Sequence, residues 1–305
     1  MNTAGKVSVF AVALVLVFGG GWAIGRAVGP LNAEADHGSA DAMPAMAGEA
    51  ALPGLAAAQN GYALVPETAP LGAGTAGDYR FRITDGSGAA LTRFAVEHDK
   101  RLHLIVLRRD GAHYRHVHPE MAVDGTWSVP LTLPAAGTYR VFADFHPEGG
   151  VKTTLGVDLQ VPGEFQPALA AGESRVFTVE DYQVRLDGDL TAGASSAVRV
   201  TITKQGRPVT DLQPYLAAYG HLVALRSSDL AYLHVHPGGT PGDGKTAAGP
   251  EVAFAVEVPT AGRYRLYLDF QHGGQVRTAE FVLDARPGAA SPAPTTGGGH
   301  GGHGG

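Results

Sequence analysis

Hydrophobic and polar residues alternate in many short stretches of this chain. Residues 79–84 read YRFRIT and residues 198–203 read VRVTIT, so apolar and polar side chains fall on opposite faces of an extended strand. In TYRVFADF at 138–145 and RYRLYLDF at 263–270, the aromatic and aliphatic positions of one face are expected to be core. The other face of these two stretches then points towards solvent or a site. The pattern predicts an all-β fold.

Beyond residue 60 the sequence contains the same unit twice. HLIVLRRDGAHYRHVHP at 103–119 aligns without a gap with HLVALRSSDLAYLHVHP at 221–237. Further along, AGTYRVFADF at 136–145 aligns with AGRYRLYLDF at 261–270. Short strands with turn signals about every ten residues are typical of sandwiches. We therefore expect two tandem immunoglobulin-like β-sandwich domains.

The N-terminal region has a different character. Residues 7–25, VSVFAVALVLVFGGGWAIG, contain no charged side chain and lie between Lys6 and Arg26. As a helix they would span roughly 28 Å, about the thickness of the hydrocarbon core of a bilayer. Because Arg26 follows directly, we expect an uncleaved, single-pass signal anchor in the cell membrane, with the C-terminal domains extracytoplasmic. The alternative is cleavage near AEA at 33–35, which would make the protein a secreted one.

These features predict an N-terminal transmembrane helix followed by a stalk, two domains and a tail. The expected segments are a short cytoplasmic end (1–6), the anchor (7–25), a flexible stalk rich in Ala, Gly and Pro (27–60), the first β-sandwich repeat (61–163), the second repeat (174–286) and a disordered Gly/His tail (287–305).

The composition and net charge of the chain argue against several classes of function. The net charge is −6, which provides no basic surface for phosphates, so nucleic acid is not an expected partner. The chain has no cysteine, which excludes disulfide bonds and thiolate metal sites. Any metal site must therefore use other ligands.

A predicted hairpin brings histidines together in the first copy. Between His103 and His118, an apolar strand is followed by the turn signal DG at 110–111 and by a second strand. With the turn centred there, His103 lies opposite His118, and His116 lies on the same face, because opposed residues share a side of the hairpin.

The second copy repeats this arrangement. Its hairpin is centred on SD at 228–229, which places His221 opposite His236. Each copy thus gathers three imidazoles at one end of one face. The candidate metal ligands are His103, His116, His118, His221, His234 and His236.

Opposed side chains of a hairpin are close enough to share an ion. Their Cβ atoms are ~4.5–5.5 Å apart, and two nitrogens on one tetrahedral ion lie roughly 3.3 Å apart, a difference that leaning imidazole rings can close. Pro119 and Pro237 end the strands and place the clusters at a rim. The secondary candidates are His98, Asp144 and His146 in the first unit, Asp269 and His272 in the second, and His300 and His303 in the tail.

A structural role for these histidines is the alternative. A His-x-His pair at a strand end can cap a core through backbone hydrogen bonds, and both copies can retain it from one ancestor. However, crowded imidazoles gain little from one another, and protonation near pH 6.5 would make them repel, a conflict that a metal ion removes. We expect metal binding, with copper first and zinc second, because copper stands highest in the affinity order.

A resemblance points to the same function. The membrane anchor, the tandem β units, and GHLVALRSSDLAYLHVHP at 220–237 followed by AGRYRLYLDFQHGG at 261–274 resemble a group of bacterial membrane-anchored extracytoplasmic proteins. The resemblance implies association with copper or heavy-metal handling. More loosely, the architecture is similar to periplasmic copper-chaperone sandwiches, from which this chain departs because its N-terminus is a membrane span.

Catalysis is not expected. His-x-His also occurs in cupins, but Glu120 follows it too soon, and GG at 238–239 stands there in the second copy. The expected function is metal sequestration or delivery, with metal ions and a metal transporter or chaperone as partners. A non-catalytic immunoglobulin-like scaffold or adhesion module with structural histidines is the alternative, and a three-histidine metalloenzyme is the third and least favoured interpretation.

Overall fold

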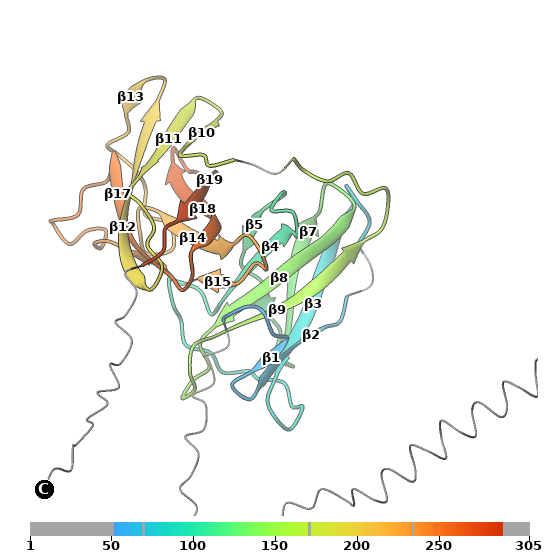
Figure 1. The fold of residues 1–305 in the computed structure, drawn as a ribbon. Helices are drawn as coiled ribbons and strands as arrows, with labels where there is room; N and C mark the ends of the chain where they lie inside the picture. Colours follow the sequence, from blue (N-terminus) through green and yellow to red (C-terminus); the bar gives the residue numbers. More distant parts are fainter. Residues whose placement is uncertain (1–51, 69–70, 170–171, 234, 289–305) are drawn as a thin grey trace, which may run out of the picture. The chain divides into compact units, whose positions relative to one another are not determined.

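The computed structural model describes residues 52–68, 71–169, 172–233 and 235–288. Within these residues, every element of regular secondary structure is a β-strand. Figure 1 shows these strands in two groups, one from each repeat. Among the described residues, none forms a helix that could cross a bilayer. The predicted anchor, most of the stalk and the tail from residue 289 lie outside the described residues.

The first repeat consists of two antiparallel sheets, with strand orders β1-β2-β3-β7-β6 and β5-β4-β8-β9. Their inner faces enclose a core that includes Phe81, Trp127 and Tyr139. The strands are β1 (Ala58–Gln59), β2 (Tyr62–Pro66), β3 (Ala76–Thr84), β4 (Leu102–Arg108), β5 (Arg115–Val117), β6 (Glu120–Met121), β7 (Thr126–Thr132), β8 (Gly137–Phe145) and β9 (Thr153–Val161).

The second repeat has the same two-layer plan. Its sheets have the orders β10-β11-β12-β17-β16, with β13 paired to β12, and β15-β14-β18-β19. Their core includes Tyr182, Phe254 and Tyr264. The strands are β10 (Val176–Val179), β11 (Tyr182–Asp187), β12 (Ala194–Lys204), β13 (Arg207–Pro208), β14 (His221–Arg226), β15 (Tyr232–Leu233), β16 (Val235–Pro237), β17 (Glu251–Val258), β18 (Gly262–His272) and β19 (Gln275–Ala285).

The alternating pattern of the sequence accounts for this plan, and the predicted pair of β-sandwiches is confirmed. The apolar face of β8 is core, since Tyr139 and Val141 are fully buried, and the matching positions Tyr264 and Leu266 of β18 are fully buried as well. In a β-sandwich, one face of each sheet is buried in the core. A strand that alternates apolar and polar residues places its apolar side chains on that face.

Next to the two turns, the predicted hairpin registers are also confirmed. In the first repeat Ile105 pairs with His116, as expected for a turn at 110–111. In the second repeat Leu225 pairs with Tyr232, as expected for a turn at 228–229. In the first hairpin, Gly111 adopts a positive φ of 84°, which favours glycine at this turn.

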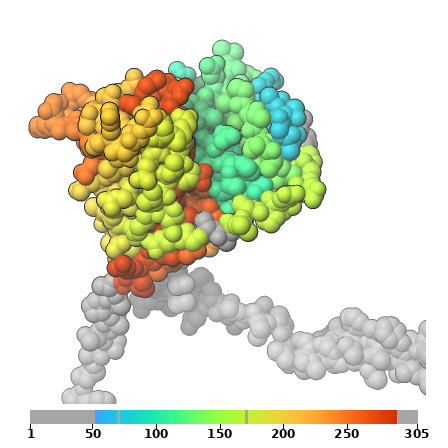
Figure 2. Space-filling model, turned by 90° about the horizontal axis from the view of Figure 1, so that it is seen from above, coloured from blue at the N-terminus to red at the C-terminus, as the bar shows by residue number. Residues whose placement is uncertain are grey.

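The outer faces of the two hairpin sheets are apolar as well, and they contact each other. All seven residues of β4 are buried, which requires that both faces of this strand be covered. The cover comes from the other repeat, through a group that we term the junction cluster: Ile105, Leu107, Tyr114, Phe142, Val223, Leu225, Leu230, Tyr232 and Tyr267. In Figure 2 the first repeat (blue to green) and the second (yellow-green to red) accordingly abut.

Candidate metal centre

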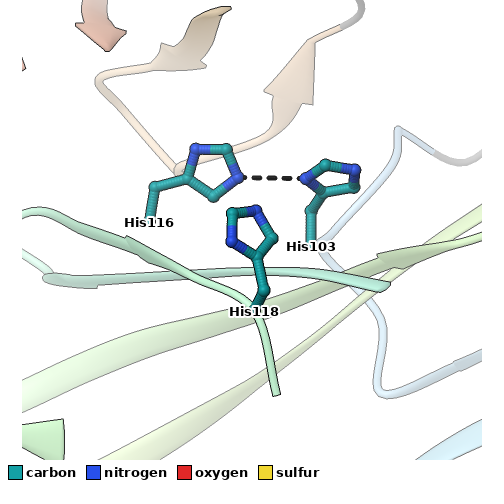
Figure 3. A group of neighbouring side chains, drawn as sticks. All are labelled: His103, His116 and His118. Carbon is teal, nitrogen blue, oxygen red and sulfur yellow. Dashed lines mark hydrogen bonds between the residues drawn. The ribbon is translucent and has the colours of Figure 1, made fainter. Parts of the chain in front are cut away.

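Three histidines of the first repeat meet at one end of its hairpin (Figure 3). His103 lies on β4, His116 lies on β5, and His118 follows β5 directly before Pro119. One ring nitrogen from each of the three lies within 4.8 Å of the others. We term these three residues the triad. Its geometry follows from the predicted register, because pairing of β5 with β4 continues to Val117.

The outward nitrogens of two triad members are bound to groups that only accept hydrogen bonds. His103 Nε2 is 3.1 Å from the carbonyl oxygen of Glu97. His116 Nδ1 is 2.8 Å from a carboxylate oxygen of Asp269. We therefore assign the proton of each ring to its outward nitrogen. In the neutral rings, the inward nitrogens then carry lone pairs.

These two inward nitrogens face each other at short range. His103 Nδ1 is 3.1 Å from His116 Nε2, the contact drawn as a dashed line in Figure 3. Two lone pairs do not bond, so either an additional proton or a cation must lie between them. Burial, followed by the charge of His116, lowers the pKa of His103 to about 4, which disfavours a proton on that ring. The spacing is close to the roughly 3.3 Å expected for two nitrogens on one tetrahedral ion.

The third member of the triad has an unused nitrogen. His118 Nε2 is buried and has no hydrogen-bond partner among the described residues. Burial is the largest influence on this ring, and with the neighbouring His116 and His103 it lowers the pKa of His118 to about 3. The ring is therefore neutral near pH 7, the state that binds metal ions.

The second repeat contributes two further side chains to this place. Asp269 on β18, whose carboxylate contacts His116, also accepts a hydrogen bond of 2.6 Å from Thr278. His221 begins β14, and its ring centre lies 5.0 Å from that of His116 and 5.5 Å from that of His103. Its Nδ1 is buried without a partner among the described residues. Burial and then the other histidines hold the pKa of His221 well below its usual range.

Two secondary candidates of the first repeat have other partners. Asp144 accepts a hydrogen bond of 2.7 Å from Thr154 and lies 3.7 Å from the Lys152 ammonium. His146 is 2.8 Å from a carboxylate oxygen of Glu97. Neither side chain is part of the triad.

The other secondary candidates divide between the two repeats. The ring of His98 lies 5.4 Å from that of His221, at the margin of the cluster, and burial followed by Lys152 lowers its pKa. His272 contacts the Tyr182 hydroxyl at 2.7 Å and Asp211 at 3.0 Å within the second repeat.

The second histidine motif differs from its prediction. His236 does not pair across the hairpin with His221, because the chain changes sheets after Leu233 and β16 joins β17, where His236 pairs with Ala255. His236 is exposed. His234, His300 and His303 lie outside the described residues. Among the residues that are described, the triad is the one group of three side chains with metal-ligand spacing.

A cavity of about 390 Å³ gives access to the cluster. His103 and His221 line it, together with Glu97, Lys152 and the exposed His236. The sequence did not indicate roles for Glu97 and Lys152. Glu97 begins a tight turn whose next two residues have positive φ, and His-Asp is not the Asn-Gly or Asp-Gly pair that signals such turns.

The triad fits a nitrogen-binding metal ion. It offers three imidazole nitrogens and no carboxylate, a donor set that suits zinc or copper and not calcium or magnesium. The Asp269 carboxylate behind His116 is the partner that commonly fixes the tautomer and orientation of a metal-binding histidine. The arrangement can hold an ion, and Asp269 makes the second repeat part of its support.

A family model described as "Domain of unknown function (DUF8832)" matches the chain twice, over residues 57–162 and 177–287. Together the two matches take in well over half of the chain. No curated protein sequence matches it.

Three of the solved structures that match this chain have low sequence identity to it. The Escherichia coli adhesin FdeC has 16% identity and a TM-score of 0.25, with 75% of this chain and 65% of that chain covered. Invasin, a bacterial integrin-binding protein, has 13% identity and a TM-score of 0.20, with 73% and 39% covered. The D0–D1 domains of intimin have 12% identity and a TM-score of 0.21, with 72% and 96% covered. This chain spans less than two thirds of the FdeC and invasin chains.

Proposed function

Because the chain belongs to the DUF8832 family, whose description gives no activity, we propose its function from the geometry of its site. The protein binds a metal ion, copper first and zinc second, through His103, His116 and His118. Its role is sequestration or delivery of the ion and not catalysis.

The observation that supports this proposal is the short contact between the inward nitrogens of His103 and His116. The Glu97 carbonyl and the Asp269 carboxylate accept hydrogen bonds from the outward N–H groups, so both inward nitrogens present lone pairs 3.1 Å apart. Facing lone pairs repel each other, and His118 Nε2, a buried polar atom without a partner among the described residues, costs a further ~1–3 kcal/mol. A cation bound by all three nitrogens would remove these costs together.

The choice of ion and location rests on chemistry and sequence. Imidazole ligands suit copper and zinc, and copper binds more tightly in the general affinity order. The apolar segment 7–25 supports a membrane-anchored, extracytoplasmic protein. In that location the delivery partner would be a metal transporter or chaperone.

A scaffold or adhesion module is the second candidate function. The junction cluster joins the two sandwiches through buried aromatic and aliphatic side chains, as a stiff spacer would require. On this view the triad is structural, and a proton between His103 and His116 takes the place of the ion. Both candidates are compatible with the same fold.

Metal content distinguishes the two candidates. The full chain, with His300→Ala and His303→Ala to remove the tail histidines, is exposed to copper or zinc, separated from free ions and measured by elemental analysis. We expect about one equivalent, lost when His103→Ala and His118→Ala are combined. The matched control is His113→Asn, at a histidine outside the triad whose positive φ of 59° asparagine tolerates.

Two results would contradict the proposal. Equal metal content in the double variant would place the ion at another site. Absence of metal from the parent chain, with its stability unchanged by copper or zinc, would favour the scaffold.

A further inference from the structure

The second repeat places an unused imidazole nitrogen beside the triad. His221 is not among the three residues whose nitrogens lie within 4.8 Å. Its ring centre nevertheless lies 5.0 Å from that of His116 and 5.5 Å from that of His103. Imidazoles that share one tetrahedral ion through nitrogens roughly 3.3 Å apart have ring centres roughly 5 Å apart. His221 is therefore within the range of a fourth ligand.

The surroundings of His221 give its buried nitrogen no other use. Nδ1 has no hydrogen-bond partner among the described residues, although buried ring nitrogens are nearly always paired. The backbone of His221 is fixed, because it pairs with Asp269 in the β14–β18 ladder. Asp269 is the residue whose carboxylate contacts His116 across the junction. This pair of neighbouring residues in the second repeat thus places an imidazole and a carboxylate beside the triad.

Aromatic contacts and a hydrogen bond across the junction hold His221 and Asp269 in place. The rings of Tyr114 and Tyr267 stack across the junction at 4.2 Å with an angle of 3° between their planes. The Tyr267 hydroxyl donates a hydrogen bond of 2.7 Å to the carbonyl of Gly111 in the first repeat. The matching pair, Phe142 and Tyr232, lies 5.7 Å apart. Candidate ligands from both repeats therefore meet at an interface that aromatic contacts and a hydrogen bond hold together.

We propose that the metal ion is held jointly by the two repeats. His221 supplies the fourth ligand, Asp269 orients His116, and the bound ion clamps the two sandwiches together. This inference rests on the proposed metal-binding function and adds that loading with metal strengthens the contact between the domains. Release of the ion then loosens that contact.

A cleavable connection between the repeats tests the clamp. A protease site is inserted after Leu169, which is 94% exposed and lies between β9 and β10. The full chain, lacking the two tail histidines, is cut after folding, and the dissociation constant of the two fragments is measured with zinc and with a chelator. We expect zinc to tighten their association by about tenfold or more, because the ion gains a ligand from the second fragment.

The variant His221→Phe isolates the fourth ligand, because it keeps an aromatic ring next to His103 and removes both nitrogens. We expect this variant to lose most of the zinc effect while its chelator-treated fragments associate as in the parent. If His221→Phe disturbs the fold, seen as weaker association in chelator, His221→Gln is the second variant. His113→Asn should keep the full zinc effect.

The outcomes separate the two proposals. Zinc that binds the intact chain without tightening the fragments would overturn the clamp and leave the metal-binding function standing. A zinc effect that persists in properly associated His221 variants would overturn the role of His221. An intact chain that binds no zinc or copper would overturn both proposals.

Discussion

The two copies of His-Val-His-Pro, at 116–119 and 234–237, have the same letters and different surroundings. In the first copy, pairing of β5 with β4 continues to Val117, so His118 remains beside His103. In the second, β15 ends at Leu233 and β16 pairs with the other sheet, which leaves His236 exposed. The comparison shows that the point at which a strand changes sheets decides whether the same motif forms a cluster.

The aspartates of the two copies differ in a related way. Asp144 and Asp269 occupy matching positions in β8 and β18, and each accepts a hydrogen bond from a threonine on the next strand. The two aspartates differ in the basic side chain that each of them contacts. Asp144 lies 3.7 Å from Lys152, whereas Asp269 contacts His116 of the other repeat at 2.8 Å. Only Asp269 therefore supports the triad.

Acidification should have the largest effect, and it should act through the first copy. The pKa values of His103 and His118, about 4 and about 3, lie below the value near 6.5 of an unfolded histidine. The unfolded chain then binds more protons, so stability is complete above pH 6.5 and falls as the pH drops towards 4 and 3. We expect a loss of several kcal/mol between pH 7 and pH 4 in urea titrations with a chelator present, because both histidines contribute.

The variant with His103→Ala and His118→Ala provides the comparison for this titration. Its free energy of unfolding should depend much less on pH over the same range. An unchanged pH dependence would assign the effect to groups outside the triad.

Substitution of one histidine in each motif should separate the two copies next. His118→Ala removes a triad nitrogen, and we expect zinc affinity to fall on the order of a hundredfold. His236→Ala alters an exposed residue that lines the cavity, and its effect should be less than about threefold. Isothermal titration with zinc measures both. Equal losses for the two variants would contradict the assignment of the site to the first copy.

Neutralising the aspartates should have a smaller effect. In Asp269→Asn the amide keeps its shape but loses the charge that supports His116, so we expect zinc to bind about tenfold more weakly. Asp144→Asn should change zinc affinity by less than about twofold, because Asp144 is paired with Thr154 and Lys152. A competition assay with a zinc chelator measures both. A larger effect of Asp144→Asn would show that Asp144, and not Asp269, is the aspartate that supports the bound ion.

The smallest effect is expected from Lys152→Val. Valine is the residue at position 276, which corresponds to Lys152 when the β8–β9 and β18–β19 registers are compared. Lys152 contacts Glu97 at 2.8 Å and Asp144 at 3.7 Å, and its side chain is 31% exposed. Loss of such a partly exposed pair should destabilise the fold by about 1 kcal/mol or less, measured by thermal unfolding. Destabilisation of several kcal/mol would mean that the lysine neutralises a fully buried charge.

The fold and the local part of the site were predictable from the sequence. Alternation fixed the core faces of β8 and β18, and the turns fixed the register that brings His103, His116 and His118 together. Both are local properties of the chain, because the alternation of side chains determines which face of a strand is buried and the position of the turn determines how the two strands pair.

The contribution of the second repeat could not be predicted in the same way. Contact of Asp269 with His116 depends on how two outer sheet faces pack, and no local pattern specifies that partner. The sequence did contain a signal that these faces are covered, since Ile105 and Phe142 are apolar positions pointing away from their own core. The change of sheet after Leu233 had no comparable signal.

The most direct test is a crystal structure of the zinc-loaded protein with anomalous data at the zinc edge. We predict one strong peak within ~2.0–2.1 Å of His103 Nδ1, His116 Nε2 and a nitrogen of His118. If no peak appears there, and His103 and His116 keep their direct contact in the presence of zinc, the cluster is structural and the metal-binding account is contradicted.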